Sequence, residues 1–147
     1  MPDIKEKLAA LLNQALELEH AARIQYLAHA ELIKGLNAEK IIERIKEIAS
    51  DEEKHEGIFR NLIGSYLNAK PSMGIAPTHP AIETAKILEI NLKNEKEAVD
   101  LYQQIYRRIM DSKDDLPYVF ETLEHQIRHI ILDEEEHIVE LSLLLGK

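Results

Sequence analysis

Apolar residues recur every three or four positions through four long stretches of the chain. This spacing, with high Ala, Leu, Glu and Lys content, predicts amphipathic α-helices rather than strands. The predicted helices span residues 3–34, 38–67, 80–110 and 116–145. Each is about 30 residues long, or roughly 45 Å at 1.5 Å per residue. The pattern therefore predicts an all-α fold.

Residues that favour helix ends mark the boundaries of the first two stretches. Pro2 and Asp3 suit the start of the first helix, with Asp3 as its N-cap. Gly35 suits the end of that helix, and Asn37 suits the N-cap of the next.

The lengths of the links predict how the helices are arranged. Short links make the first and second helices antiparallel neighbours, and likewise the third and fourth. The middle link, residues 68–79, is long enough to cross the bundle from end to end, so the second and third helices run parallel. Pro80 and Pro117 are expected in the first turns of the third and fourth helices. The sequence predicts one domain, residues 1–147, folded as an up-down-down-up four-helix bundle with a single long crossover.

Ionisable residues interrupt the apolar stripes near the middle of all four predicted helices. They are Glu19, Glu52, His55, Glu95, Glu134 and His137. Buried charge is strongly disfavoured unless it is paired or metal-bound. Two divalent metal ions would balance the four carboxylates, and ligands of oxygen and nitrogen suit iron or manganese.

The chain repeats itself between its two halves. Residues 19–26 and 95–102 both read E-x-x-A-x-x-x-Y, and residues 51–55 and 133–137 both read D-E-x-x-H. Positions three apart share one face of a helix, so each D-E-x-x-H stretch directs a carboxylate and an imidazole the same way. A pseudo-two-fold axis between the halves would bring the six residues together as two symmetric sites. The small alanine of each longer motif would leave room beside the metals.

Helical register separates the candidate ligands from neighbouring acidic residues. Glu17 and Glu97 do not lie on the core stripes of their helices, whereas the candidates beside them do. Glu53, Glu135 and Glu136 also fall off the core stripe, so we expect them at the surface.

The remaining histidines form no second recognisable site. His29 lies on a core stripe and is expected to be a buried core residue. His20, His125 and His129 lie off the ligand stripes and are expected at the surface or at an interface, while His79 lies in the crossover.

Composition narrows the possible function classes. The chain has no Cys, which excludes disulfides, thiol catalysis and Cys-ligated metal clusters. Its net charge is −9, with 27 acidic against 18 basic residues, so no nucleic-acid partner is expected. With no signal sequence and no apolar run of about 18 residues, a cytoplasmic location without membrane insertion is expected.

These motifs together resemble the ferritin-like di-iron carboxylate superfamily, which includes bacterioferritin and rubrerythrin, over nearly the whole chain. The resemblance implies that two carboxylates bridge a pair of iron ions and that one Glu and one His complete each iron. The implied ligands are Glu52 and Glu134 as bridges, Glu19 with His55 at one iron, and Glu95 with His137 at the other.

The resemblance also implies roles for four residues beside the ligands. Tyr26 and Tyr102 would flank the site, where each could hydrogen-bond a carboxylate or carry a transient electron; the alternative is half-buried core filler. Asp51 and Asp133 would hold the imidazoles from across the site; the alternative is exposed charge.

The chain departs from two members of the superfamily. Glu53 stands where bacterioferritin has its haem-ligating Met, so no haem is expected. Ala98 stands where rubrerythrin has an additional Glu, and the Cys-ligated rubredoxin domain that rubrerythrin usually carries is absent.

The expected function is that of a non-haem di-iron oxidoreductase, a ferroxidase that oxidises Fe(II) with O₂ or H₂O₂. The alternatives are a rubrerythrin-like peroxide reductase without a rubredoxin domain, a non-catalytic protein that binds manganese or zinc, and an oxidase of an organic substrate. Apolar residues off the core stripes also favour a homo-oligomer, at least a dimer. These residues are Leu27, Ile42, Ile63, Ile131 and Val139.

Overall fold

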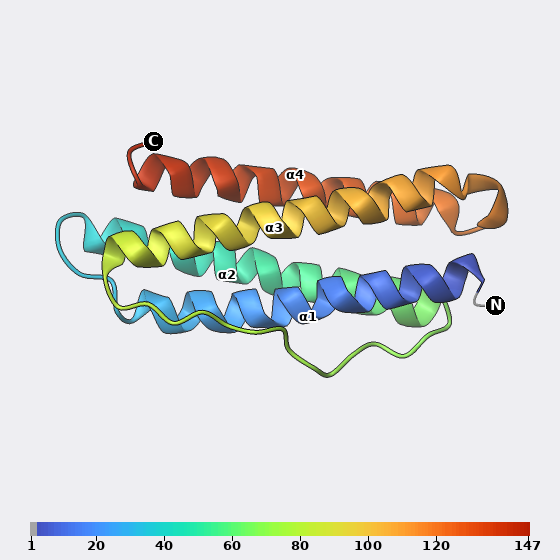
Figure 1. Cartoon of the computed structure of the whole chain (residues 1–147), viewed down its shortest axis with the longest axis horizontal. Helices are drawn as coiled ribbons and strands as arrows, with labels where there is room; N and C mark the ends of the chain where they lie inside the picture. The colour runs from blue at the N-terminus through green and yellow to red at the C-terminus, as the bar shows by residue number, and fades with distance from the viewer. Residues whose placement is uncertain (1–2) are drawn as a thin grey trace.

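Four long α-helices make up most of residues 3–147, the part of the chain that this computed structural model describes (Figure 1). The helices are α1 (Ile4–Ala30), α2 (Ala38–Asn61), α3 (Thr84–Asp111) and α4 (Phe120–Leu144). Two short turns accompany them: η1 (Leu62–Tyr66), a π-helical turn that prolongs α2, and η2 (Lys113–Asp115), a 3-10 turn before α4. These residues contain no strand, so the predicted all-α class is confirmed.

The helices run up, down, down and up, as predicted. Figure 1 shows α1 and α4 running in one direction and α2 and α3 in the other. The link between η1 and α3, drawn in green, returns along the bundle beside α1. α1 packs chiefly against α2, and α3 against α4, so each half of the chain is an antiparallel helical hairpin.

The first two helices begin where the sequence predicted, although their ends differ in detail. The Asp3 carboxylate caps α1 by accepting a hydrogen bond from the Glu6 amide at 2.8 Å. α1 ends at Ala30, four residues earlier than predicted, and Gly35 then takes a left-handed φ of 97°. Asn37 precedes α2 but has a left-handed φ of 63° and makes no side-chain capping bond. Pro2 lies outside the described residues.

The predicted start of α3 at Pro80 is wrong. α3 begins at Thr84, and residues 80–83 instead extend the crossover. The Thr84 hydroxyl accepts a hydrogen bond from the Lys34 amide and donates one to the Lys34 carbonyl, both at 3.1 Å. This tertiary contact fixes the start of the helix against the end of the first hairpin.

The predicted start of α4 near Leu116 is also wrong, because the helix begins at Phe120. Leu116 is buried in the core, but Tyr118 takes a left-handed φ of 70°, which interrupts a right-handed helix. Pro117 therefore lies in a turn before the helix and not in its first turn.

Polar side chains of α1 hold the crossover in place. The Asn13 side chain accepts a hydrogen bond from the Ser72 amide at 2.8 Å, and Glu17 accepts one from the Ser72 hydroxyl. Further along, the Gln25 side chain accepts a hydrogen bond from the His79 amide at 2.6 Å. Glu17 is thus engaged at the surface, as its register predicted.

A polar layer divides the buried core into two apolar clusters. The first includes Leu12, Phe59, Tyr102, Ile105, Leu123 and Ile127. The second includes Tyr26, Ile45, Ile48, Ile87, Leu88 and Leu141. Each cluster contains residues from all four helices. Close packing therefore holds the polar layer from both sides.

Three of the five apolar residues assigned to an outer face contact the core instead: Ile63 is buried, and Ile42 and Ile131 are partly buried and pack against the two clusters. Ile63 lies four residues after the buried Phe59, which places both side chains on one face of the helix. Leu27 and Val139 are exposed as predicted, at 43% and 57%. Among the helices of residues 3–147, none combines the length and the apolar character needed to cross a membrane.

Candidate metal centre

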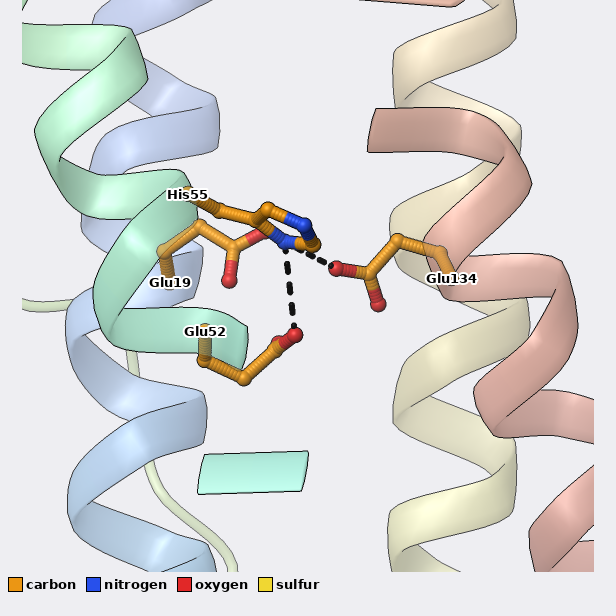
Figure 2. Close-up of side chains that lie close together, drawn as sticks. All are labelled: Glu19, Glu52, His55 and Glu134. Atoms are coloured by element: carbon orange, nitrogen blue, oxygen red, sulfur yellow. Dashed lines mark hydrogen bonds and ion pairs between the residues drawn. The ribbon is translucent and has the colours of Figure 1, made fainter. Parts of the chain in front are cut away.

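All six predicted ligands converge in the polar layer, and all four helices contribute. None of the six residues is more than 3% exposed. They form two groups in which one donor atom of each residue lies within 4.8 Å of the others. The groups are Glu19, Glu52, His55 and Glu134, drawn in Figure 2, and Glu52, Glu95, Glu134 and His137.

His55 lies at the middle of the first group, with its side chain directed toward α4 (Figure 2). Its Nδ1 atom is 2.9 Å from Glu134 Oε1, 3.5 Å from Glu52 Oε1 and 3.6 Å from Glu19 Oε1. A divalent ion with ligand distances near 2 Å could be held between these atoms after small side-chain movements.

The second group repeats this geometry around the other imidazole. His137 Nδ1 is 3.4 Å from Glu52 Oε1, 3.5 Å from Glu134 Oε2 and 3.6 Å from Glu95 Oε1. Glu52 and Glu134 thus lie against both imidazoles, whose ring centroids are 6.3 Å apart. This is the position from which a carboxylate can bridge two metal ions.

Asp51 and Asp133 hold the outer edges of the two imidazoles. His55 Nε2 donates to Asp133 Oδ2 and His137 Nε2 donates to Asp51 Oδ2, both at 2.9 Å. Each bond joins α2 to α4 and turns the opposite ring nitrogen, Nδ1, toward the centre. Such a partner fixes the ring angle and the tautomer that a metal ligand needs.

The two predicted tyrosines contact ligands on the opposite half of the chain. The Tyr26 hydroxyl donates to Glu95 Oε1, and the Tyr102 hydroxyl donates to Glu19 Oε1, both at 2.6 Å. Both side chains are almost fully buried, at 1% exposed. They therefore position candidate ligands in addition to filling the core.

Without a metal, the imidazoles of the centre are protonated. Burial opposes this charge, but hydrogen bonds and negative charge from Glu134 and Glu19 outweigh it and raise the pKa of His55 to about 11. At His137, burial is again outweighed, here by Glu134 and Glu95, and the pKa rises to about 12.

The carboxyl groups of the centre divide into two kinds. Burial, followed by the charge of Glu134, raises the pKa of Glu95 to about 8, and burial with the surrounding carboxylates raises the pKa of Glu52 well above its usual range. At Glu134, burial and the charge of Glu19 oppose ionisation, but close contacts with Glu95, His137 and His55 outweigh them and lower the pKa. Close carboxylates cannot all ionise together, so protons take the place of cations.

Unpartnered atoms in the polar layer fit a metal-binding role. Within the described residues, five buried side-chain atoms have no hydrogen-bond partner: Glu19 Oε2, Glu52 Oε1, Glu95 Oε2, Glu134 Oε2 and His137 Nδ1. Buried polar atoms without partners are costly and rare. These five belong to the candidate ligands and include one from each carboxylate, so the donor set fits a pair of divalent cations.

Replacing Tyr102 with phenylalanine should destabilise the metal-free protein. The change leaves Glu19 without its hydroxyl donor, and a buried hydrogen bond to a carboxylate contributes about 1.5–3 kcal/mol. Urea denaturation measures the effect. The control is Tyr106→Phe, which removes a partly buried hydroxyl bond to Glu124 (2.8 Å) away from the centre and should cost much less. Equal losses in the two variants would contradict a special role for Tyr102.

A cavity of about 260 Å³ between α1 and α3, beneath the crossover, reaches the centre. Glu52 and Glu95 lie in its lining, and Ala22 and Ala98 widen it where larger side chains would close it. The small alanines of the repeated motif therefore lie beside the centre, as predicted. The cavity gives small molecules a path to the candidate ligands.

One wall of this cavity is a polar network that the sequence did not reveal. The Gln25 amide donates to Asn91 Oδ1 and to Asn94 Oδ1, both at 2.8 Å, and Asn91 Nδ2 contacts His29 Nδ1 at 3.0 Å. The available signal was that Asn91 and His29 both lie on core stripes. His29 is buried, as predicted, and contacts Asn91, which lines the cavity.

Glu56 is a fifth buried carboxylate, next to the four of the centre, and sequence reasoning missed it. It is 2% exposed, but Arg23 hydrogen-bonds it directly, and His20 Nε2 and Arg60 Nη1 lie 3.5 and 3.6 Å from its Oε1. These partners neutralise Glu56 on the outer side of α2, so it is not a free ligand. The feature of the sequence that could have indicated its burial is the i,i+4 spacing from Glu52, which places both residues on neighbouring positions of one helix face.

Structural comparison gives close matches over the whole fold. A ferritin-like di-iron carboxylate protein from Bacillus anthracis str. Ames is 23% identical, with a TM-score of 0.89 and 99% of each chain covered. A bacterioferritin from Rhodobacter capsulatus, described with a metal-free dinuclear site and heme iron, is 23% identical, with a TM-score of 0.84 over 95% of this chain and 84% of that one. A dodecameric thioferritin from Bacteroides fragilis is 24% identical, with a TM-score of 0.82 over 98% and 86%.

Sequence comparison identifies the family. No curated protein sequence matches the chain significantly. The model of the ferritin-like domain, however, matches residues 9–147, which include most of α1, the whole of α2, α3 and α4, and all six candidate ligands. The chain therefore belongs to the ferritin-like domain family.

Proposed function

We propose that this protein is a non-haem di-iron oxidoreductase that oxidises Fe(II) with O₂ or H₂O₂. The observation that carries the proposal is the pair of overlapping buried groups that share Glu52 and Glu134. Two linked metal positions in a water-poor core suit a two-electron reaction better than a single surface site does. The unpartnered carboxylate oxygens add support, since cations would satisfy them.

Each residue of the centre would have a definite task. Glu19 with His55 would hold one iron, Glu95 with His137 the other, and the shared carboxylates would bridge them. Bound iron supplies the electrons for reduction of the oxidant. The chain orients the imidazoles through Asp51 and Asp133, steadies two carboxylates through the tyrosine hydroxyls, and excludes bulk water with the apolar clusters on either side.

The relatives support the same proposal and add an expectation about assembly. One is titled a di-iron carboxylate protein, others are bacterioferritins, and one is a dodecamer. We infer that this chain also forms a homo-oligomer, because Leu27, Val139 and Leu143 leave apolar side chains exposed on the helices.

The test is anaerobic loading of the metal-free protein with Fe(II), followed by addition of air or H₂O₂. We expect two Fe(II) bound per chain and a ferric near-UV absorption band on oxidation. Comparing the rates with the two oxidants separates a ferroxidase that uses O₂ from a peroxide reductase. Two tightly bound irons that stay ferrous under both oxidants would overturn the proposal.

A second candidate function is a non-catalytic site for manganese or zinc. The observation that favours this function is the donor set of the centre, because oxygen and nitrogen ligands also bind manganese and zinc. Metal analysis of protein purified from its own host distinguishes the two. Zinc or redox-silent manganese at two per chain would favour this alternative over iron oxidation.

Replacing Ala98 with phenylalanine should slow iron oxidation severalfold by filling the cavity that reaches Glu52 and Glu95. Equilibrium binding of the metals should remain, because the ligands are unchanged. Stopped-flow absorbance after mixing with Fe(II) and O₂ measures the rate. The control is Ala10→Phe on the exposed face of α1, which should oxidise Fe(II) at the wild-type rate. A wild-type rate for Ala98→Phe would show that substrates arrive by another path.

A further inference from the structure

Two exposed histidines on α4 lie side by side, far from the apolar core. His125 and His129 are four residues apart, which places them on one face of the helix. Their ring centroids are 4.3 Å apart and the ring planes meet at 38°. Both residues are exposed, so their ring nitrogens are accessible to ions in solution.

This separation is close to that of two imidazoles on one metal ion. With metal–nitrogen distances of about 2.0–2.1 Å and angles between about 90° and 110°, the two centroids lie roughly 4.5–5 Å apart. The rings of His125 and His129 would need to move apart by only a few tenths of an ångström. The helix therefore holds the two rings at a spacing that is compatible with chelation of one ion.

The charged side chains next to the pair are already engaged with each other. Arg128 Nε donates to Glu124 Oε2 at 2.7 Å, and the Tyr106 hydroxyl donates to the same carboxylate at 2.8 Å. Within residues 3–147, neither imidazole of the pair makes a hydrogen bond or an ion pair. The imidazole nitrogens of the pair are thus available as donors, and the exposed Glu121 lies four residues before His125 on the same face.

We propose that His125 and His129 form a second metal site, which binds one divalent transition ion such as Ni²⁺, Cu²⁺ or Zn²⁺. Two imidazoles at i and i+4 are a known metal-binding arrangement on helices, and water can complete the coordination. The pair has no carboxylate in its chelate, unlike the buried centre. By ligand type and by the general order of affinities, it favours these ions over Fe²⁺ and Mn²⁺.

The pair lies one helical turn from a residue that contacts the buried centre. Asp133 is one turn beyond His129, about 6 Å along the helix axis, on the same face. The Asp133 side chain is 52% exposed, and its carboxylate contacts His55. An ion held by the pair is therefore one helical turn from the residue that orients a candidate ligand, but outside the buried donor set.

Retention on immobilised Ni²⁺ tests this site without interference from the buried centre. A resin-bound ion cannot reach ligands that are at most 3% exposed, so only surface imidazoles contribute. We expect the untagged protein to bind the resin and to elute with imidazole. His125→Ala and His129→Ala should each elute much earlier, and the double variant should not bind.

The matched control is His79→Ala, which removes one exposed imidazole and keeps the backbone amide that bonds Gln25. It should elute with the wild type. Titration calorimetry with Ni²⁺ in solution should show one site weaker than the buried centre, whose affinity falls by about a hundredfold in each α4 variant. Unchanged retention and stoichiometry in the double variant, or an equal loss in His79→Ala, would overturn the proposal.

Discussion

Replacing Glu52 with glutamine is expected to abolish binding at both metal positions and to leave the metal-free fold as stable as the wild type at neutral pH. Glu52 belongs to both donor groups, so its loss affects both ions. Burial and the neighbouring carboxylates raise the pKa of Glu52 well above its usual range, so the group holds a proton when no metal is bound. Glutamine has the shape and the neutral charge of that protonated form.

The matched variant Glu134→Gln should behave differently. Close contacts with Glu95, His137 and His55 outweigh burial and the charge of Glu19 and lower the pKa of Glu134, so its ionised form is part of the metal-free structure. His55 Nδ1 lies 2.9 Å from it. Removing this charge leaves protonated imidazoles buried without their main partner, at a cost of about 3 kcal/mol or more.

Elemental analysis of reconstituted protein and urea denaturation of metal-free protein measure both variants. We expect little or no metal in either, and a large loss of stability in Glu134→Gln alone. Two retained metals in Glu52→Gln would contradict the bridging position. Equal stability of the two metal-free variants would contradict the inference that Glu52 is protonated and Glu134 ionised when no metal is bound.

Metal binding at pH 7 should release about four protons per chain, since ligands must be deprotonated to bind. Two come from His55 and His137, whose pKa values of about 11 and about 12 keep them charged. Two come from Glu52 and Glu95, the latter with a pKa of about 8. Calorimetry in buffers with different ionisation enthalpies measures the number. Release of fewer than about two protons would show that the metal-free carboxyls and imidazoles are not protonated as described.

The same groups set the pH dependence of the metal-free protein. All of them have pKa values that are higher in the folded state than in the unfolded state, so the folded state binds more protons. Their stabilisation is present at low pH. It is lost from about pH 4.5 to about 8 as Glu95 ionises, and from about 6.5 to about 11 or 12 as His55 and His137 lose their protons. Metal-loaded protein should show the opposite trend, because protons compete with the ions.

The sequence predicted the bundle and the convergence of the six residues because both depend on helical periodicity. An ionisable residue in the middle of an apolar stripe, such as Glu95 or His137, must lie inside the bundle once the stripe packs against the other helices. Repetition of two motifs in the same order fixed the pseudo-two-fold arrangement. That the converging residues bind metal stays a prediction until ions are measured.

Sequence reasoning failed where tertiary contacts or local geometry override propensity. Pro80 suits a helix start, but the hydrogen bonds between Thr84 and Lys34 place the start four residues later. Ile63 was assigned to an outer face, yet it lies four residues after the buried Phe59 and packs in the core, because the buried face of the helix is wider than a single stripe. Glu56 is covered chiefly by Arg23 of α1, and its i,i+4 spacing from Glu52 could not reveal this contact with another helix.

The contacts that orient the centre all join one hairpin of the chain to the other. Tyr26 reaches Glu95, Tyr102 reaches Glu19, and the two aspartates reach imidazoles across the bundle. In an assembly of two identical hairpins these would be intermolecular bonds, and each substitution would appear twice. Fusion through the crossover makes the two hairpins inequivalent: the cavity beneath the crossover is lined by Glu95 and not by Glu19. The two donor groups are thus alike in residue types but unlike in their access to this cavity, an asymmetry that a symmetric dimer of hairpins could not adopt.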